Sequence, residues 1–230
     1  MADHVYGVRP RLAVMTGYGA RTGAVVMTVG IAAACWVVVV TQMRGMDMGV
    51  ETGLGSFGYF VGVWAAMTAA MMLPGTAPAV GNFARTQKRA VAALPFAASY
   101  LGVWTLFGVA SYAVYRPHGT VAAGIVTVAA GLYELTPLKR RARQRCREGA
   151  RSGIHLGPHC LVSSAGLMLL LLAVGVMNIA WMSAIAAVVL VQKLTPPRKP
   201  VDATLALAIV ALGAVILTSP SSVPGLVPAM

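Results

Sequence analysis

Methionine occurs beside possible metal ligands in three short segments of the chain. Met46 and Met48 flank Asp47, which places two thioethers beside a carboxylate, and Glu51 follows about one helical turn after Asp47. Thioethers suit Cu(I), whereas carboxylates extend the choice to Cu(II) and other divalent ions. The segment therefore predicts a metal site. The alternative is that the methionines pack at a membrane interface while the acidic side chains are solvated.

The second segment is an apolar run that also carries two prolines. Met67 and Met71 are four positions apart, so a helix would bring their sulfurs onto one side. Pro74 and Pro78 follow, and each lacks the N–H that would bond to a carbonyl one turn earlier. In lipid such a carbonyl needs another partner. The run predicts a methionine-lined site or, alternatively, a helix whose methionines fill gaps in the core.

The third segment contains Met177, Asn178 and Met182. Its amide could take part in a site with the two thioethers, or it could cap a helix that begins there. Glu134 is the one carboxylate inside an apolar run of the sequence. Intramembrane carboxylates are candidate functional groups, and we weigh two roles for Glu134, structural pairing with a base and a proton relay.

A weaker candidate is the cluster formed by His155, His159 and Cys160. Two imidazoles and a thiol would suit Cu(I) or Zn(II). We expect Pro158 to break the helical spacing of the histidines, so only His159 and Cys160 are kept as weaker ligands. The three cysteines of the chain show no obvious pair, and we expect no disulfide framework.

Helices long enough to cross a membrane must position these residues. The chain has 230 residues, 58% of them hydrophobic and 10% charged. Several apolar runs approach or exceed the roughly 20 residues that a helix needs to span hydrocarbon. We therefore predict an all-α bundle of about seven transmembrane helices with a cytoplasmic N-terminus. The runs lie near 22–42, 57–80, 92–115, 119–137, 158–176, 178–193 and 203–219.

The number of spans depends on the stretch from about Leu161 to Val191. This stretch forms either one long tilted helix or two shorter helices that meet near Gly175 to Asn178. Two helices keep nearly all Lys and Arg residues on the cytoplasmic side, whereas one helix moves the last basic group outside. The positive-inside rule therefore favours seven spans over six. In that topology the loop at 44–51 and the turn at Met177 face outside.

The formal net charge of +12 does not point to nucleic acid, because the bases lie between apolar runs and lack interleaved aromatic residues. We predict a basic cytoplasmic segment at 1–21, one transmembrane domain at 22–219 and a tail at 220–230. The bases between Lys139 and Arg151 would contact anionic lipid of the inner leaflet. The alternative for these bases is docking of a protein partner.

Four segments taken together resemble a bacterial family described as predicted metal-binding integral membrane proteins. The resemblance covers about Arg44 to Lys193 and implies a multi-pass protein of the bacterial inner membrane that binds a metal ion. In this family further cysteines tend to follow the position of Cys160, where this chain has Ser163 and Ser164, and glutamine is frequent at Glu134. The segments are Trp64 to Pro74, Leu132 to Lys139, Cys160 and Gly175 to Met182, and the Met46 to Gly49 loop fits the same pattern.

The resemblance implies a metal, and the thioethers favour copper. We predict copper handling or transport, in which the outer loop recruits the ion and Met67 and Met71 relay it inward. One alternative is a membrane-embedded copper redox enzyme or a subunit of a larger membrane complex. A catalytic role ranks lower because only His118 is predicted on the outer side. Another alternative is a metal-free assembly factor. Other membrane proteins or a second copy of the chain are candidate partners.

Overall fold

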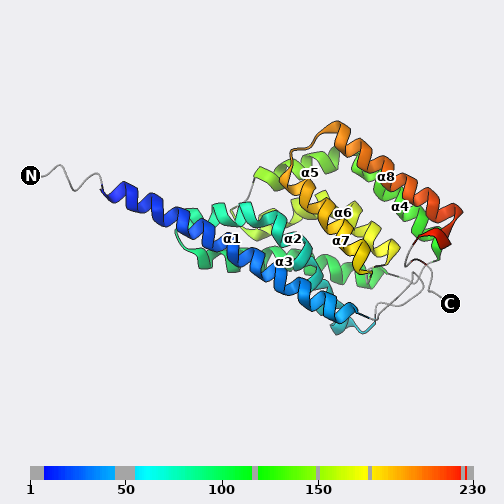
Figure 1. Cartoon of the computed structure of the whole chain (residues 1–230), viewed down its shortest axis with the longest axis horizontal. Helices are drawn as coiled ribbons and strands as arrows, with labels where there is room; N and C mark the ends of the chain where they lie inside the picture. The colour runs from blue at the N-terminus through cyan, green and yellow to red at the C-terminus, as the bar shows by residue number, and fades with distance from the viewer. Residues whose placement is uncertain are drawn as a thin grey trace, which may run out of the picture.

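The computed structural model describes residues 8–44, 55–115, 119–148, 151–175, 178–223 and 226, with 8–16 and 199 described by their backbone alone. Within these residues the chain is helical and has no strand, so the predicted all-α class is confirmed (Figure 1). Two short 3-10 turns, η1 and η2, occur at Ala90–Ala92 and Pro220–Ser222. The helices are α1 (Val8–Met43), α2 (Phe57–Gln87), α3 (Ala93–Val114), α4 (Thr120–Glu134), α5 (Pro137–Glu148), α6 (Gly153–Val174), α7 (Ile179–Leu194) and α8 (Lys199–Thr218).

Glycine, proline and asparagine set the important helix ends. Gly175 ends α6 with a φ of 124°, a conformation that side-chain-bearing residues rarely adopt. Asn178 then caps α7. The stretch from Leu161 to Val191 is therefore two helices, and the alternative of a single long helix is wrong. Pro137 begins α5, which is bent by 65° from α4.

Five helices are long and apolar enough to cross a membrane, namely α1, α2, α3, α6 and α8. The bent pair α4 and α5 passes the same test if it is counted as one span, and α7 is a shorter apolar helix. The structure is thus compatible with a multi-pass membrane protein. The seven-span count and the cytoplasmic N-terminus stay predictions.

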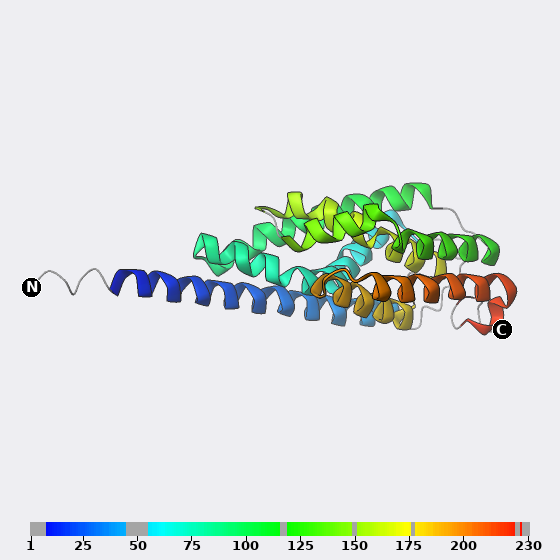
Figure 2. The same cartoon turned by 90° about the horizontal axis from the view of Figure 1, so that it is seen from above.

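The helices run roughly along one axis, and α1 projects beyond the others at its N-terminal end (Figures 1 and 2). The pair α1 and α2 packs along much of its length, as does the pair α4 and α8. Small residues allow the second pair to approach closely. A Cβ added at Gly131 of α4 would lie 2.9 Å from the backbone nitrogen of Val210 in α8.

Most basic helix ends meet at one end of the bundle, which we call the basic end. Arg143 of α5 bonds to the C-terminal part of α7 and to Asp202 of α8. Gly17 of α1 lies close to Arg85 of α2, where a Cβ would be 3.4 Å from the Arg85 Cγ. The N-termini of α2 and α7 lie at the opposite end (Figure 1). These basic residues thus lie at one end of the bundle, and the membrane topology predicted from the loop charges stays a prediction.

Candidate functional site

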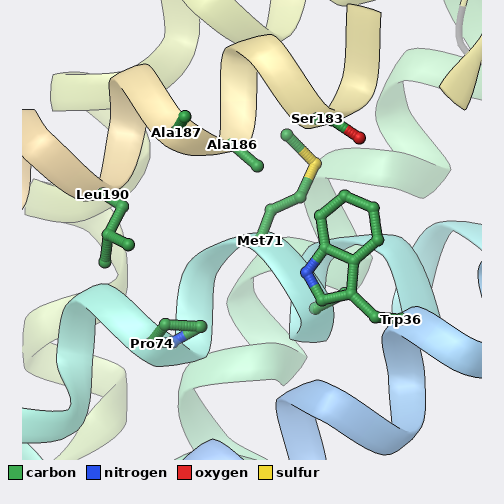
Figure 3. Close-up of a pocket in the computed structure, with 8 residues that line it drawn as sticks. Trp36, Met71, Pro74, Ser183, Ala186, Ala187 and Leu190 are labelled. Atoms are coloured by element: carbon green, nitrogen blue, oxygen red, sulfur yellow. The ribbon is translucent and has the colours of Figure 1, made fainter. Parts of the chain in front are cut away.

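A cavity of about 400 Å³ opens between α1, α2 and α7. Trp36 of α1, Met71 of α2 and Ser183 of α7 form its walls, together with small and apolar side chains. Figure 3 shows the Met71 side chain extending from α2 toward Ser183, beside the Trp36 ring. The Met71 thioether and the Trp36 ring therefore lie side by side at this space, with Ser183 at its edge. We call this space the Met71 cavity.

The proline segment contributes to the same cavity. Ala70 and Pro74 both line it, and α2 continues as one helix through Pro74 and Pro78. Because Pro74 has no N–H, it cannot make the usual helical bond to the Ala70 carbonyl. A carbonyl in this situation is a ready ligand for a cation or a polar guest. The two candidate features of the sequence, methionine and proline, thus meet at one cavity wall.

The other predicted thioethers of the helix interior do not line the cavity. Met67 lies one turn before Met71, as its spacing predicted, and like Met71 it is buried in the core, but it is not among the residues that line the cavity. Met182 precedes the cavity residue Ser183 in α7, and it is also fully buried. The structure therefore places one sulfur at the Met71 cavity and two more in the core helices around it.

Asn178 acts as the N-cap of α7. Its side-chain oxygen accepts hydrogen bonds from the backbone N–H groups of Ala180 at 3.0 Å and Trp181 at 3.2 Å. This is the capping role weighed from the sequence. The remaining predicted ligands of the outer face lie outside the described residues. They are Met46, Asp47, Met48, Glu51 and Met177.

Lys193 is a buried lysine whose position the sequence did not reveal. Its side-chain nitrogen donates to the Tyr100 hydroxyl at 2.9 Å and lies 3.5 Å from both the carbonyl oxygen and the sulfur of Met72. No carboxylate pairs with it among the described residues. Gly75 provides the space, since a Cβ there would lie 2.5 Å from the Lys193 Cδ. The sequence assigned Lys193 only to the cytoplasmic basic group, because a glycine opposite a lysine gives no local pattern.

Glu134 lies in a buried polar cluster with Lys139 and Gln192. One carboxylate oxygen accepts from the Lys139 ammonium, and the other accepts from the Gln192 amide at 2.8 Å. The Lys139 ammonium also donates to the Gln192 side-chain oxygen at 3.2 Å. All three side chains are buried. Both oxygens of Glu134 are thus engaged in contacts that join the end of α4 to α5 and α7.

A second buried ion pair continues this cluster. The Arg143 guanidinium donates to Asp202 at 2.6 Å and to the Gln192 carbonyl at 2.7 Å. The same group donates to the Thr195 carbonyl at 3.2 Å. Lys139 and Arg143 are only 2% and 4% exposed. The expectation that these two bases contact lipid is therefore wrong, because both are used to join α5 to neighbouring helices.

Cys146 and Cys160 form a disulfide that joins α5 to α6, with their Cα atoms 5.2 Å apart. The expectation that the cysteines have no pair is wrong, because α5 and α6 fold back on each other and bring together residues separated by 14 positions. Pro158 also lies inside α6 without interrupting it, which corrects the expected break between the histidines. His159 is half-buried. Among the described residues, no three His, Cys, Asp or Glu side chains are grouped to hold a metal ion.

Comparison with known proteins gives one result. A family model described as copper chaperone, PpoB2, matches residues 61–216, which is more than half of the chain. The match contains the Met71 cavity residues of α2 and α7 and the cysteine pair, and it begins after the Met46 to Glu51 loop. No curated protein and no solved structure matches the chain.

Proposed function

Because the chain belongs to the PpoB2 copper chaperone family, we propose that it handles Cu(I) through its methionines as a multi-pass protein of the bacterial inner membrane. Copper is its cargo in this proposal, bound at Met71 and passed on. The family description supports the metal, and the five long apolar helices support the membrane location.

The position of Met71 carries the proposal. All three methionines are buried in the core, but Met71 alone among Met67, Met71 and Met182 lines the cavity. A thioether is a soft ligand that prefers Cu(I) to harder divalent ions. The Ala70 carbonyl, which has no donor at Pro74, supplies an oxygen from the same helix.

Two further cavity groups bear on the binding of a monovalent cation. The Trp36 ring can attract a cation through its π face. The Ser183 hydroxyl lies at the edge of the cavity and donates to the Ile179 carbonyl at 2.7 Å, so a rotation of this side chain would be needed before its oxygen could contact an ion in the cavity. The lining residues of this cavity include no histidine and no cysteine. This donor set suits reversible holding of Cu(I) better than a Cu(II) redox centre.

The buried lysine supports holding rather than free conduction. A cation that left Met71 toward the basic end would meet the buried Lys193 side chain, whose nitrogen contacts Met72. This side chain fills the space opposite Gly75 and leaves no open path in that direction. We therefore propose that the ion enters from the outer loop, moves past Met67 and stays at Met71 until a partner or a conformational change releases it.

Competition with a chromophoric Cu(I) chelator under reducing conditions tests the site. Met71→Leu keeps the side-chain volume but removes the sulfur, and we expect it to weaken Cu(I) binding by about tenfold or more, which is about 1.4 kcal/mol. Met168→Leu is the matched control, because Met168 is fully buried in α6 and does not line the cavity. Equal Cu(I) affinity of the two variants would remove the support for Met71.

Sealed vesicles separate a relay from a permanent site. If the wild-type protein moves copper, Met67→Leu combined with Met71→Leu should abolish accumulation while binding at the outer loop remains. The opposite pattern is that wild-type vesicles accumulate no copper and the two substitutions remove all bound metal. That pattern would favour the redox-subunit alternative, in which one static site holds the ion.

A further inference from the structure

The disulfide between Cys146 and Cys160 joins α5 to α6, and α5 lies toward the basic end of the protein, away from the start of α7 (Figure 1). In the proposed topology this end faces the bacterial cytoplasm. Cytoplasmic thiols are kept reduced, so a disulfide there is expected to open to two thiols in the cell. The structure thus brings two reducible sulfurs together at the end where a carrier of copper would meet cytoplasmic partners.

We propose that the reduced Cys146 and Cys160 pair is a second Cu(I) site, separate from the Met71 cavity. This inference rests on the proposed copper-handling function and names a site for it at the inner face. Each thiol loses one proton when it binds, so one Cu(I) replaces two protons and the complex carries a single negative charge. Thiolates are soft ligands that select Cu(I).

The ligand count favours copper over zinc. Structural zinc sites take four ligands in a tetrahedron. Around this pair no third His, Cys, Asp or Glu completes a group within the described residues. Gly149 and Ala150, which lie outside the described residues, have no ligating side chain. A site with only two sulfur ligands suits Cu(I), which accepts a lower coordination number than Zn(II).

Basic side chains near the pair suit an anionic complex. Arg145 and Arg147 are the exposed sequence neighbours of Cys146 in α5, and their positive charge would partly balance the negative charge of a copper dithiolate. A cavity of about 500 Å³ nearby is lined by Arg147, Glu148 and Arg151 and by residues of α2, but by neither cysteine. Cys146 is 8% exposed and Cys160 is fully buried, so the ion would reach Cys146 first.

The oxidation state would control this site. A disulfide offers no thiolate, so the joined pair cannot bind Cu(I) in the proposed way. Two molecules of a low-molecular-weight thiol open it by exchange, in which they form their own disulfide while the protein sulfurs gain two electrons and two protons. Binding of Cu(I) then releases those two protons. Side-chain rotation can separate the sulfurs enough to place the ion between them.

The copper content of the full-length protein, measured with the cysteine pair oxidised and with it reduced, tests the proposal without any substitution. One sample is left oxidised, and another is reduced with a phosphine that is then removed. Both samples are loaded with Cu(I), and their bound copper is compared. We expect reduction to add about one copper per chain, with thiolate-to-copper charge-transfer absorption. No added copper on reduction, or an equal preference for Zn(II), would overturn the inference.

Variants assign the added copper. Cys146→Ser and Cys160→Ser should each remove the reduction-dependent copper, whereas Cys35→Ser should retain it, because Cys35 is a free cysteine in α1. If Cys146→Ser and Cys160→Ser both still bind additional copper after reduction, the assignment is wrong. Met71→Leu should keep this increment while weakening the other site. The failure of the inner site can thus be told from the failure of the proposed function.

Alkylation in intact cells gives an independent check. A membrane-permeant thiol reagent should label Cys146 and Cys160 in cells grown without added oxidant, because the pair is expected to be reduced there. A pair that remains fully oxidised in such cells would overturn the inner site, since a disulfide cannot supply the two thiolates.

Discussion

Replacing Arg143 by methionine should destabilise the protein strongly. Arg143 is 4% exposed, and its guanidinium donates to Asp202 at 2.6 Å. Removing one partner of a buried ion pair leaves an uncompensated charge and typically costs about 3–5 kcal/mol. Arg140 remains 4.0 Å from Asp202 but its side chain is 32% exposed, so it compensates the carboxylate only in part. We therefore expect a loss near the lower value, about 3 kcal/mol.

The unfolding free energy can be measured by titrating dodecyl sulfate into detergent micelles and following helicity by circular dichroism. Arg141→Met is the matched control, since Arg141 lies in the same helix and is exposed. A surface change of this kind should alter stability by no more than about 0.5 kcal/mol. Combining Arg143→Met with Asp202→Leu should recover about 2 kcal/mol or more of the loss, because the lone charge is then removed as well.

A small effect would refute this reasoning. If Arg143→Met lies within about 1 kcal/mol of the wild type, the pair does not have the buried character on which the magnitude rests. Additive effects of Arg143→Met and Asp202→Leu would show that the two side chains do not interact.

Three more predictions concern the lysine pocket, the cavity and the topology. Gly75→Ala should cost about 1–3 kcal/mol in the same unfolding assay because its Cβ would overlap the buried lysine, whereas Gly62→Ala, with no atom within 4 Å of its Cβ, should be tolerated. Trp36→Leu should weaken Cu(I) binding by about two- to thirtyfold if its ring contacts the ion, and an unchanged affinity would exclude that contact. Cysteine-accessibility labelling should find 44–51 and the C-terminal tail outside and 139–151 inside, and labelling of the tail from the cytoplasm would overturn the seven-span topology.

The helices could be predicted from the sequence because long apolar runs with glycine and proline between them have few other solutions. The break at Gly175 followed from loop charge, since only two helices keep the basic groups on one side. Met71 could be selected from its spacing and its prolines. Its place beside a cavity could not, because Met67 shares the same helical face and is equally buried, yet does not line the cavity.

The contacts at the basic end could not be predicted because they depend on how distant helices meet. Lys139, Arg143 and Cys146 recur along one face of α5 at helical spacing, which is a signal for a buried face. We did not predict a buried face here, because a run of basic residues usually indicates a solvated surface. Cys146 pairs with Cys160 only because α6 folds back on α5, and Lys193 is accommodated only because Gly75 faces it.

Elemental analysis of the protein purified from membranes under reducing conditions tests copper binding most directly. We predict that copper is the metal that copurifies and that Met71→Leu lowers its content while Met168→Leu does not, with both variants equally folded. Zinc or iron in place of copper would contradict the thioether site. A protein that retains no metal, even after loading with Cu(I), would contradict copper handling and favour a metal-free assembly factor.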